Sequence, residues 1–167
     1  MSKTSHKSGY VSIVGNPNVG KSTLVNALIG KDLTITTPKA QTTRHRILGL
    51  INGENYQLVL SDTPGIIEPA YEMQNSMMKF VKESLIDADV LIYMIAINED
   101  QTKDQKLVDK IKKIKIPLLV LINKIDLVKS KFEPGSLGLI VELMNYEHLE
   151  RECAKVIWVS DEVEPMY

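Results

Sequence analysis

Short apolar runs alternate with amphipathic segments along this chain. Largely apolar runs of strand length occupy residues 10–14, 90–95 and 118–122, and a polar turn or loop follows each. Strands that are buried on both faces give such continuous runs, so these segments predict parallel strands inside a sheet. Apolar residues at helical spacing predict helices over about 21–29, 102–114 and 139–153. A further helix is predicted from the apolar stripe Met73, Met77, Phe80, Val81 and Leu85.

One pair of β-like segments differs from the others because a tight turn joins them. Residues 46–51 and 56–60 flank Asn52-Gly53, which is a hairpin signal. Residues 156–159 give a last strand. We therefore expect an α/β fold: a doubly wound, mostly parallel six-stranded sheet with one antiparallel edge strand.

Length and composition favour one domain with an ordinary core. The 167 residues contain 20 basic and 21 acidic side chains, so bulk attraction to nucleic acid or membrane is not expected. Residues 1–8 are polar and are predicted to be a flexible tail before a domain at 9–167. A single cysteine, Cys153, excludes an internal disulfide, and the three histidines have no zinc-ligand spacing.

The loop after the first predicted strand carries the strongest chemical signal. It fits G-x-x-x-x-G-K-[ST], the phosphate-binding P-loop, between a strand and a helix. The motif and the residue after it are Gly15, Asn16, Pro17, Asn18, Val19, Gly20, Lys21, Ser22 and Thr23. Gly15 and Gly20 allow the backbone to approach phosphates closely, and the N–H groups that open the helix attract anions. Lys21 is predicted to reach the β- and γ-phosphates, and Ser22 to coordinate Mg²⁺.

A second loop, Asp62-Thr63-Pro64-Gly65, follows the predicted strand at 56–60. Asp62 can hold Mg²⁺ through a water molecule. The N–H group of Gly65 can contact the γ-phosphate, and hydrolysis would release the loop. The alternative is an ordinary D-x-P-G turn.

A third loop, Asn123-Lys124-Ile125-Asp126, indicates which base is bound. It follows the run 118–122, at the carboxyl end of a predicted strand, where open α/β sheets bind ligands. The Asp126 carboxylate can accept two hydrogen bonds from guanine, whereas adenine would leave it unpaired. Asn123 is expected to tie this loop to the P-loop, and the Lys124 stem to cover one face of the base.

The three motifs in this order resemble the translation-factor-related GTPases, with the P-loop NTPase G domain as the implied fold. The string 39–46, Lys-Ala-Gln-Thr-Thr-Arg-His-Arg, together with 15–22 and 62–66, resembles the Era-like bacterial GTPases. The EngA and MnmE relatives are less similar because their loops read T-R-D. The resemblance is close over residues 9–128.

The resemblance implies several roles. Residues 41–45 would form the switch loop, with Thr43 as a Mg²⁺ ligand and Thr42 as the alternative. Asn18 matches the asparagine that coordinates K⁺ in cation-dependent relatives. Ile66 stands where many GTPases carry a water-orienting glutamine, so we expect slow hydrolysis of GTP to GDP that depends on K⁺ or on a partner.

The resemblance also sets expectations about partners and location. Era-like chains continue into a KH domain that binds 16S rRNA, and we identify none here. Action on the small ribosomal subunit is therefore expected only from the family resemblance, and RNA binding is not expected of this chain. The expected location is cytoplasmic, with peripheral association at the inner face of the cell membrane as an open alternative. Ser160 matches the family's last base-contacting loop, but Asp161 replaces its alanine and brings negative charge towards guanine.

The sequence leaves two other functions open. It could be a module that binds guanine nucleotides with little hydrolysis, which the apolar Ile66 favours. A P-loop ATPase or nucleotide kinase is disfavoured by Asn123 and Asp126. A GXXG sequence at 135–138 matches a KH loop, but it lacks flanking basic residues and reads more simply as a helix entry.

Overall fold

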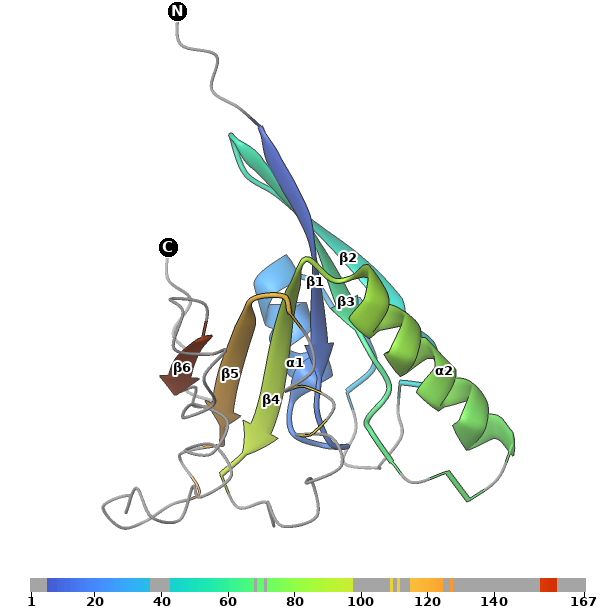
Figure 1. Ribbon diagram of the computed structural model, residues 1–167. Helices are drawn as coiled ribbons and strands as arrows, with labels where there is room; N and C mark the ends of the chain where they lie inside the picture. Colours follow the sequence, from blue (N-terminus) through green and yellow to red (C-terminus); the bar gives the residue numbers. More distant parts are fainter. Residues whose placement is uncertain are drawn as a thin grey trace, which may run out of the picture.

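The computed structural model describes residues 6–36, 43–67, 69–70, 72–97, 109, 111, 115–124 and 127, and the backbone of 154–158 (Figure 1). Its elements are β1 (Lys7–Val14), α1 (Lys21–Ile29), β2 (Ile47–Asn52), β3 (Tyr56–Asp62), α2 (Glu72–Asp87), β4 (Val90–Ala96), β5 (Leu118–Asn123) and β6 (Ala154–Trp158).

The strands form one mixed sheet in the order β2-β3-β1-β4-β5-β6. Only β2 and β3 pair antiparallel, across the turn at Gly53, and every other neighbouring pair is parallel. The predicted α/β fold with one antiparallel edge strand is thus confirmed. In Figure 1, α2 lies in front of the sheet and α1 behind it.

The core lies in two layers because the central strands bury both faces. In β4, Leu91, Tyr93 and Ile95 belong to the cluster that includes Val81 of α2. The alternate residues Ile92, Met94 and Ala96 belong to the cluster that includes Val25 of α1. This period-two division explains why the sequence shows an unbroken apolar run there.

The topology brings the predicted motifs to one edge of the sheet. The P-loop follows β1, which lies between β3 and β4, so the chain reverses its winding direction at this point. Asp62 ends β3 and Asn123 ends β5, at the carboxyl ends of parallel strands. Open α/β sheets bind ligands in the crevice at such a switch point.

Two details of the prediction need correction. The first strand begins at Lys7, so Lys7 and Ser8 belong to β1, where they pair with Tyr56 and Gln57, rather than to a flexible tail. Met73 is 40% exposed and does not join the core, unlike Met77 on the same predicted stripe.

Other expectations fall largely or wholly beyond the described residues. Ile111 of the helix predicted at 102–114 is helical and 3% exposed, but most of that segment is not described. The helix predicted at 139–153, with Cys153, lies wholly outside the described residues.

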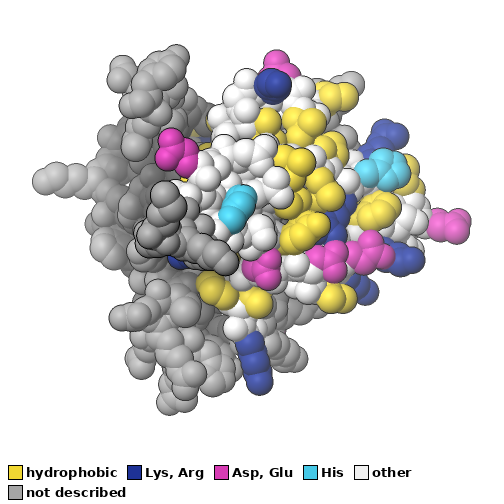
Figure 2. Space-filling model, turned by 90° about the horizontal axis from the view of Figure 1, so that it is seen from above, with side chains coloured by type: hydrophobic (Ala, Val, Ile, Leu, Met, Phe, Trp, Pro, Cys, Tyr) yellow, Lys and Arg dark blue, Asp and Glu magenta, His cyan; other side chains and the backbone are white. Residues whose placement is uncertain are grey.

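Figure 2 views the end of the molecule that is uppermost in Figure 1, away from the carboxyl ends of the strands. Hydrophobic side chains gather near the middle of this face, with charged residues of both signs around them. None of the helices in the described part of the chain combines the length and the apolar character that crossing a bilayer requires.

Candidate functional site

The P-loop backbone turns sharply between β1 and α1. Gly20 precedes the first helical residue with φ 104°, in the left-handed region that favours glycine. A Cβ atom on Gly20 would lie 2.4 Å from Nδ2 of Asn123, and one on Gly15 would lie 2.1 Å from the carbonyl oxygen of Met94. Both glycines are therefore required by close approach. Gly20 has no side chain to cap α1, and the positive end of the helix dipole at this point favours an anion.

The Lys21 ammonium is buried beneath this loop. The side chain is 6% exposed, and Nζ donates hydrogen bonds to the carbonyl oxygens of Gly15 (3.0 Å) and Asn16 (2.7 Å). Backbone carbonyls thus hold the ammonium against the loop that would surround the phosphates. Lys21 can offer its positive charge to an anion in the loop without a large rearrangement of its stem.

Three oxygen-bearing side chains from three segments meet beside Lys21. Ser22 Oγ donates to Asp62 Oδ2 at 2.7 Å and lies 3.1 Å from Thr43 Oγ1. Thr43 Oγ1 also donates to Asp62 Oδ2, at 3.4 Å. These are the three residues predicted to bind Mg²⁺, so the structure brings the whole set together. Thr42, the alternative to Thr43, is not among the described residues.

Asp62 is the anionic centre of this group. It is fully buried, and its Oδ1 has no hydrogen-bond partner among the described residues. Burial raises the pKa of Asp62 above its ordinary value of 3.8, while the Ser22 hydrogen bond and the Lys21 charge oppose that rise. An unpaired buried carboxylate oxygen next to two hydroxyl groups fits a small hard cation such as Mg²⁺. The described residues hold no cluster of three His, Cys, Asp or Glu side chains, so water and phosphate oxygens would complete such a shell.

The Asp62–Gly65 loop lies directly against the P-loop. Thr63 Oγ1 donates to the carbonyl oxygen of Ile13 in β1 at 2.7 Å, which fixes the start of the loop. The N–H group of Ile66 donates to the carbonyl oxygen of Gly15 at 3.1 Å. A Cβ atom on Gly65 would come within 2.7 Å of Pro17, so only glycine allows this contact. The two loops that are predicted to contact the phosphates are therefore neighbours.

The start of the predicted base-binding loop is tied to the same region. Asn123 is 4% exposed, and its Nδ2 donates to the carbonyl oxygen of Val19 at 2.8 Å. The link expected between this loop and the P-loop is present. Lys124 is half-buried with φ 60°. Asp126 and Ser160 lie outside the described residues, so their roles remain predictions.

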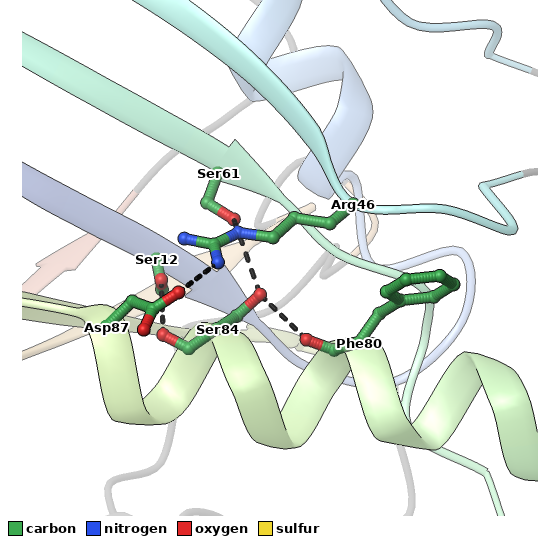
Figure 3. Close-up of polar contacts among 6 residues, drawn as sticks. All are labelled: Ser12, Arg46, Ser61, Phe80, Ser84 and Asp87. Atoms are coloured by element: carbon green, nitrogen blue, oxygen red, sulfur yellow. Dashed lines mark hydrogen bonds and ion pairs between the residues drawn. The ribbon is translucent and has the colours of Figure 1, made fainter.

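Sequence reasoning missed one polar cluster close to the site (Figure 3). Arg46, expected only to begin a strand, donates from Nε to Ser61 Oγ at 2.9 Å and forms an ion pair with Asp87. Ser61 Oγ in turn lies 3.4 Å from Ser84 Oγ. The available signal was the serines inside otherwise apolar strand runs, including Ser12, which is fully buried.

Comparison with known proteins agrees with this geometry. A profile of the family described as "50S ribosome-binding GTPase" matches residues 10–124. The chain belongs to this GTPase family. The match covers the P-loop, the Asp62 loop and the start of the base-binding loop, which are the segments that meet at the carboxyl edge of the sheet.

Among individual relatives, the GTPase is similar to GTPase Era of Staphylococcus epidermidis, at 44% identity over 75% of this chain and 42% of that protein. A crystal structure of Era in complex with MgGDPNP and nucleotides 1506–1542 of 16S ribosomal RNA superposes with a TM-score of 0.79 at 40% identity, covering 93% of this chain and 51% of that one. A structure of an Aquifex aeolicus Era variant bound to GDP and AlF₄⁻ gives the same TM-score at 41% identity, over 92% and 51% of the two chains.

These relatives confirm the resemblance to Era. This chain spans about half the length of the Era chains that it matches. The G domain of FeoB from Methanococcus jannaschii superposes with a TM-score of 0.62 at 24% identity, over 92% of this chain and 87% of that one, and shares the fold.

Proposed function

We propose that this chain is the GTP-binding and GTP-hydrolysing switch domain of an Era-like assembly factor of the small ribosomal subunit. The observation that carries the proposal is the meeting of Ser22, Thr43 and Asp62 beside the buried ammonium of Lys21. A triphosphate needs a cation, a positive side chain and backbone N–H groups in one place. At this edge of the sheet, Ser22, Thr43 and Asp62 would hold the cation, and the Lys21 ammonium lies beside the P-loop backbone.

The residues divide the work in a simple way. The N–H groups from Gly15 to Ser22 would surround the phosphates, and Lys21 would stabilise negative charge on the transferred phosphoryl group. Ser22 and Thr43 would hold Mg²⁺ directly, and Asp62 would hold it through water. When bound, Mg²⁺ would neutralise charge on the β- and γ-phosphates. The products would be GDP and phosphate.

Guanine selectivity is assigned to Asp126. A titration with labelled GDP in Mg²⁺ should give saturable binding that excess ATP does not displace. Asp126→Asn should weaken GDP binding and strengthen binding of xanthosine diphosphate, because xanthine carries a carbonyl oxygen where guanine carries an amine. Failure of the wild-type chain to bind GDP or GTP would refute the proposed function. If the variant kept the wild-type preference for GDP over xanthosine diphosphate, the role of Asp126 alone would be refuted.

We also infer that fast catalysis depends on K⁺ or on a partner, and we assign the K⁺ role to Asn18. Ile66, at the position after Gly65, packs against the core cluster that includes Val81 of α2 and has no polar group to orient water. Asn18, on the exposed turn of the P-loop, is assigned to K⁺ by resemblance. Single-turnover hydrolysis should be slow in Na⁺ and faster in K⁺, and Asn18→Ala should remove the difference. A fast reaction in Na⁺ without a partner would contradict this role.

The second candidate is a nucleotide-binding module with little hydrolysis, and the apolar Ile66 is the observation that favours it. The single-turnover experiment separates the two candidates. Nucleotide-dependent binding without phosphate release in K⁺ and in the presence of small ribosomal subunits would favour the module.

The ribosomal partner is proposed from the relatives, because an Era chain was crystallised with a segment of 16S rRNA. Cosedimentation with small ribosomal subunits should be stronger with a GTP analogue than with GDP. We place the protein in the cytoplasm, with peripheral association at the inner membrane face as the alternative, which fractionation of cells would distinguish.

A further inference from the structure

We propose that Arg46 is a positioning residue that couples the Thr43 segment to the end of α2. Through it, the nucleotide state and the position of α2 would influence each other. The inference rests on the proposed function, in which Thr43 engages Mg²⁺ and the triphosphate. Arg46, Ser84 and Asp87 lie outside the nucleotide-binding motifs.

The first observation is that the short segment from Thr43 to Arg46 is held at both ends. At one end, Thr43 Oγ1 lies 3.1 Å from Ser22 Oγ and 3.4 Å from Asp62 Oδ2. At the other end, Arg46 Nε donates to Ser61 Oγ at 2.9 Å, and Ser61 precedes Asp62 in β3. Only Arg44 and His45 lie between the two held residues, and three peptide units span at most about 10 Å. A displacement of Thr43 is therefore expected to reach Arg46.

The second observation is that this segment contacts α2 at two positions along the helix. The ring of His45 packs against the ring of Phe80, with centroids 5.4 Å apart and planes inclined by 58°. The Arg46 guanidinium forms an ion pair with Asp87, the last residue of the helix. Figure 3 shows the guanidinium lying between β3 and the last turns of α2. The contacts run from the middle of the helix to its end.

The third observation is electrostatic. A helix C-terminus carries partial negative charge, and cations near it are stabilising. The last turn of α2 has no basic residue of its own and ends on the acidic Asp87. Arg46 supplies the missing positive charge from another part of the chain. A hydrogen bond of 2.7 Å from Ser12 Oγ to the carbonyl oxygen of Ser84 satisfies one of the helix's free carbonyls.

The fourth observation is that the pairing of Arg46 is incomplete. The Arg46 side chain is 15% exposed, and its Nη2 is buried with no hydrogen-bond partner among the described residues. Asp87 is 53% exposed, so its ion pair is partly screened by water. A guanidinium with one unsatisfied nitrogen and a solvent-exposed partner is held less firmly than a fully paired one. A small difference in contacts between the two nucleotide states is then enough to move it.

The test compares the affinities for a non-hydrolysable GTP analogue and for GDP, both with Mg²⁺, in wild type, Arg46→Ala, Arg46→Lys and Asp87→Asn. Thr43 is expected to engage only the triphosphate state. Arg46→Ala should therefore lower the ratio of analogue affinity to GDP affinity about five- to tenfold. Arg46→Lys should recover part of the ratio, because an ammonium keeps the charge but not the forked geometry. Lys82→Ala, which removes an exposed positive charge from α2, is the matched control and should leave the ratio unchanged.

A merely structural role would give a different result. Hydrogen exchange of the amides in the last turns of α2 should differ between analogue-bound and GDP-bound wild type, and Arg46→Ala should abolish the difference. A double-mutant cycle of Arg46→Ala with Asp87→Asn should give different coupling in the two nucleotide states. Equal coupling in both states, or an equal loss of both affinities, would overturn the proposal. If Arg46→Ala does not fold, the exposed Asp87→Asn carries the same test. If the wild-type protein bound neither nucleotide, the proposed function on which the coupling rests would instead be refuted.

Discussion

The hydrogen bond from Asn123 Nδ2 to the carbonyl oxygen of Val19 gives a sharp test of the link between the base-binding loop and the P-loop. Asn123→Asp keeps the shape of the side chain but replaces the donor with an oxygen. At neutral pH a carboxylate oxygen would then face a carbonyl oxygen at about the 2.8 Å now seen in the wild type, at a position that is 4% exposed. No cavity forms, so the whole effect is electrostatic.

The expected loss has two parts. An unsatisfied buried polar group costs about 1–3 kcal/mol, and the buried charge adds to that cost. We therefore expect Asn123→Asp to lower the free energy of unfolding by about 3 kcal/mol at pH 7. Burial should raise the folded-state pKa of the new carboxyl above its unfolded value. Stability from such a group is present below the unfolded pKa and is lost as pH rises through the folded pKa. The deficit should therefore shrink on acidification, when a protonated carboxyl can donate to Val19.

The assay is urea unfolding of wild type, Asn123→Asp and Asn123→Ala between pH 4.5 and 7.5, without nucleotide. The buried Asp62 is present in all three proteins, so its titration largely cancels in the differences. Asn123→Ala removes the donor without adding charge, and its deficit should not change with pH. If Asn123→Asp were within about 0.5 kcal/mol of wild type at pH 7, or if its deficit did not change with pH, the argued role of this bond would be refuted.

Three further outcomes are expected. Gly20→Ala should destabilise the protein by about 2 kcal/mol, measured by urea unfolding, because the left-handed φ is strained and the new methyl group would strike Asn123; a neutral effect would contradict this geometry. Ser22→Ala should weaken Mg²⁺-dependent GDP binding about tenfold or more, whereas Thr43→Ala should weaken only the binding of a GTP analogue. Fluorescence titration with and without EDTA measures both affinities, and equal losses for both nucleotides in both variants would refute the division of roles. Burial raises the pKa of Asp62, so without metal and nucleotide its contribution to stability falls as pH rises through that pKa. In unfolding experiments from pH 4 to pH 7.5, the free energy of unfolding of Asp62→Asn should therefore rise relative to that of wild type, and the variant should lose its response to Mg²⁺. A pH-independent difference would contradict this.

The sequence was sufficient wherever the signal is local or periodic. The run in β4 is apolar at every position because both of its faces are buried, and the pattern alone predicted a central strand. The P-loop could be placed because its chemistry restricts Gly15, Gly20 and Lys21 within eight residues. The bond from Asn123 to Val19 spans more than a hundred positions, yet it was expected because the base-binding motif fixes where the asparagine must lie.

Other features could not be predicted because they depend on packing between distant segments. Lys7 and Ser8 carry no apolar signal, and they join β1 through backbone hydrogen bonding, which does not depend on side-chain type. Met73 has the right helical spacing, but it lies in the first turn of α2 and is exposed. The contacts of Arg46 require side chains from β3 and from α2, and no pattern within its own segment indicates them.

The bond between the N–H group of Ile66 and the carbonyl oxygen of Gly15 has a consequence for how readily the two phosphate loops separate. A hydrogen bond of this kind contributes about 1 kcal/mol net, which favours the joined arrangement only about fivefold over the parted one. Taken alone, a bond of this strength breaks and re-forms readily. A single additional contact of ordinary strength to the nucleotide would then be enough to reverse or reinforce the balance.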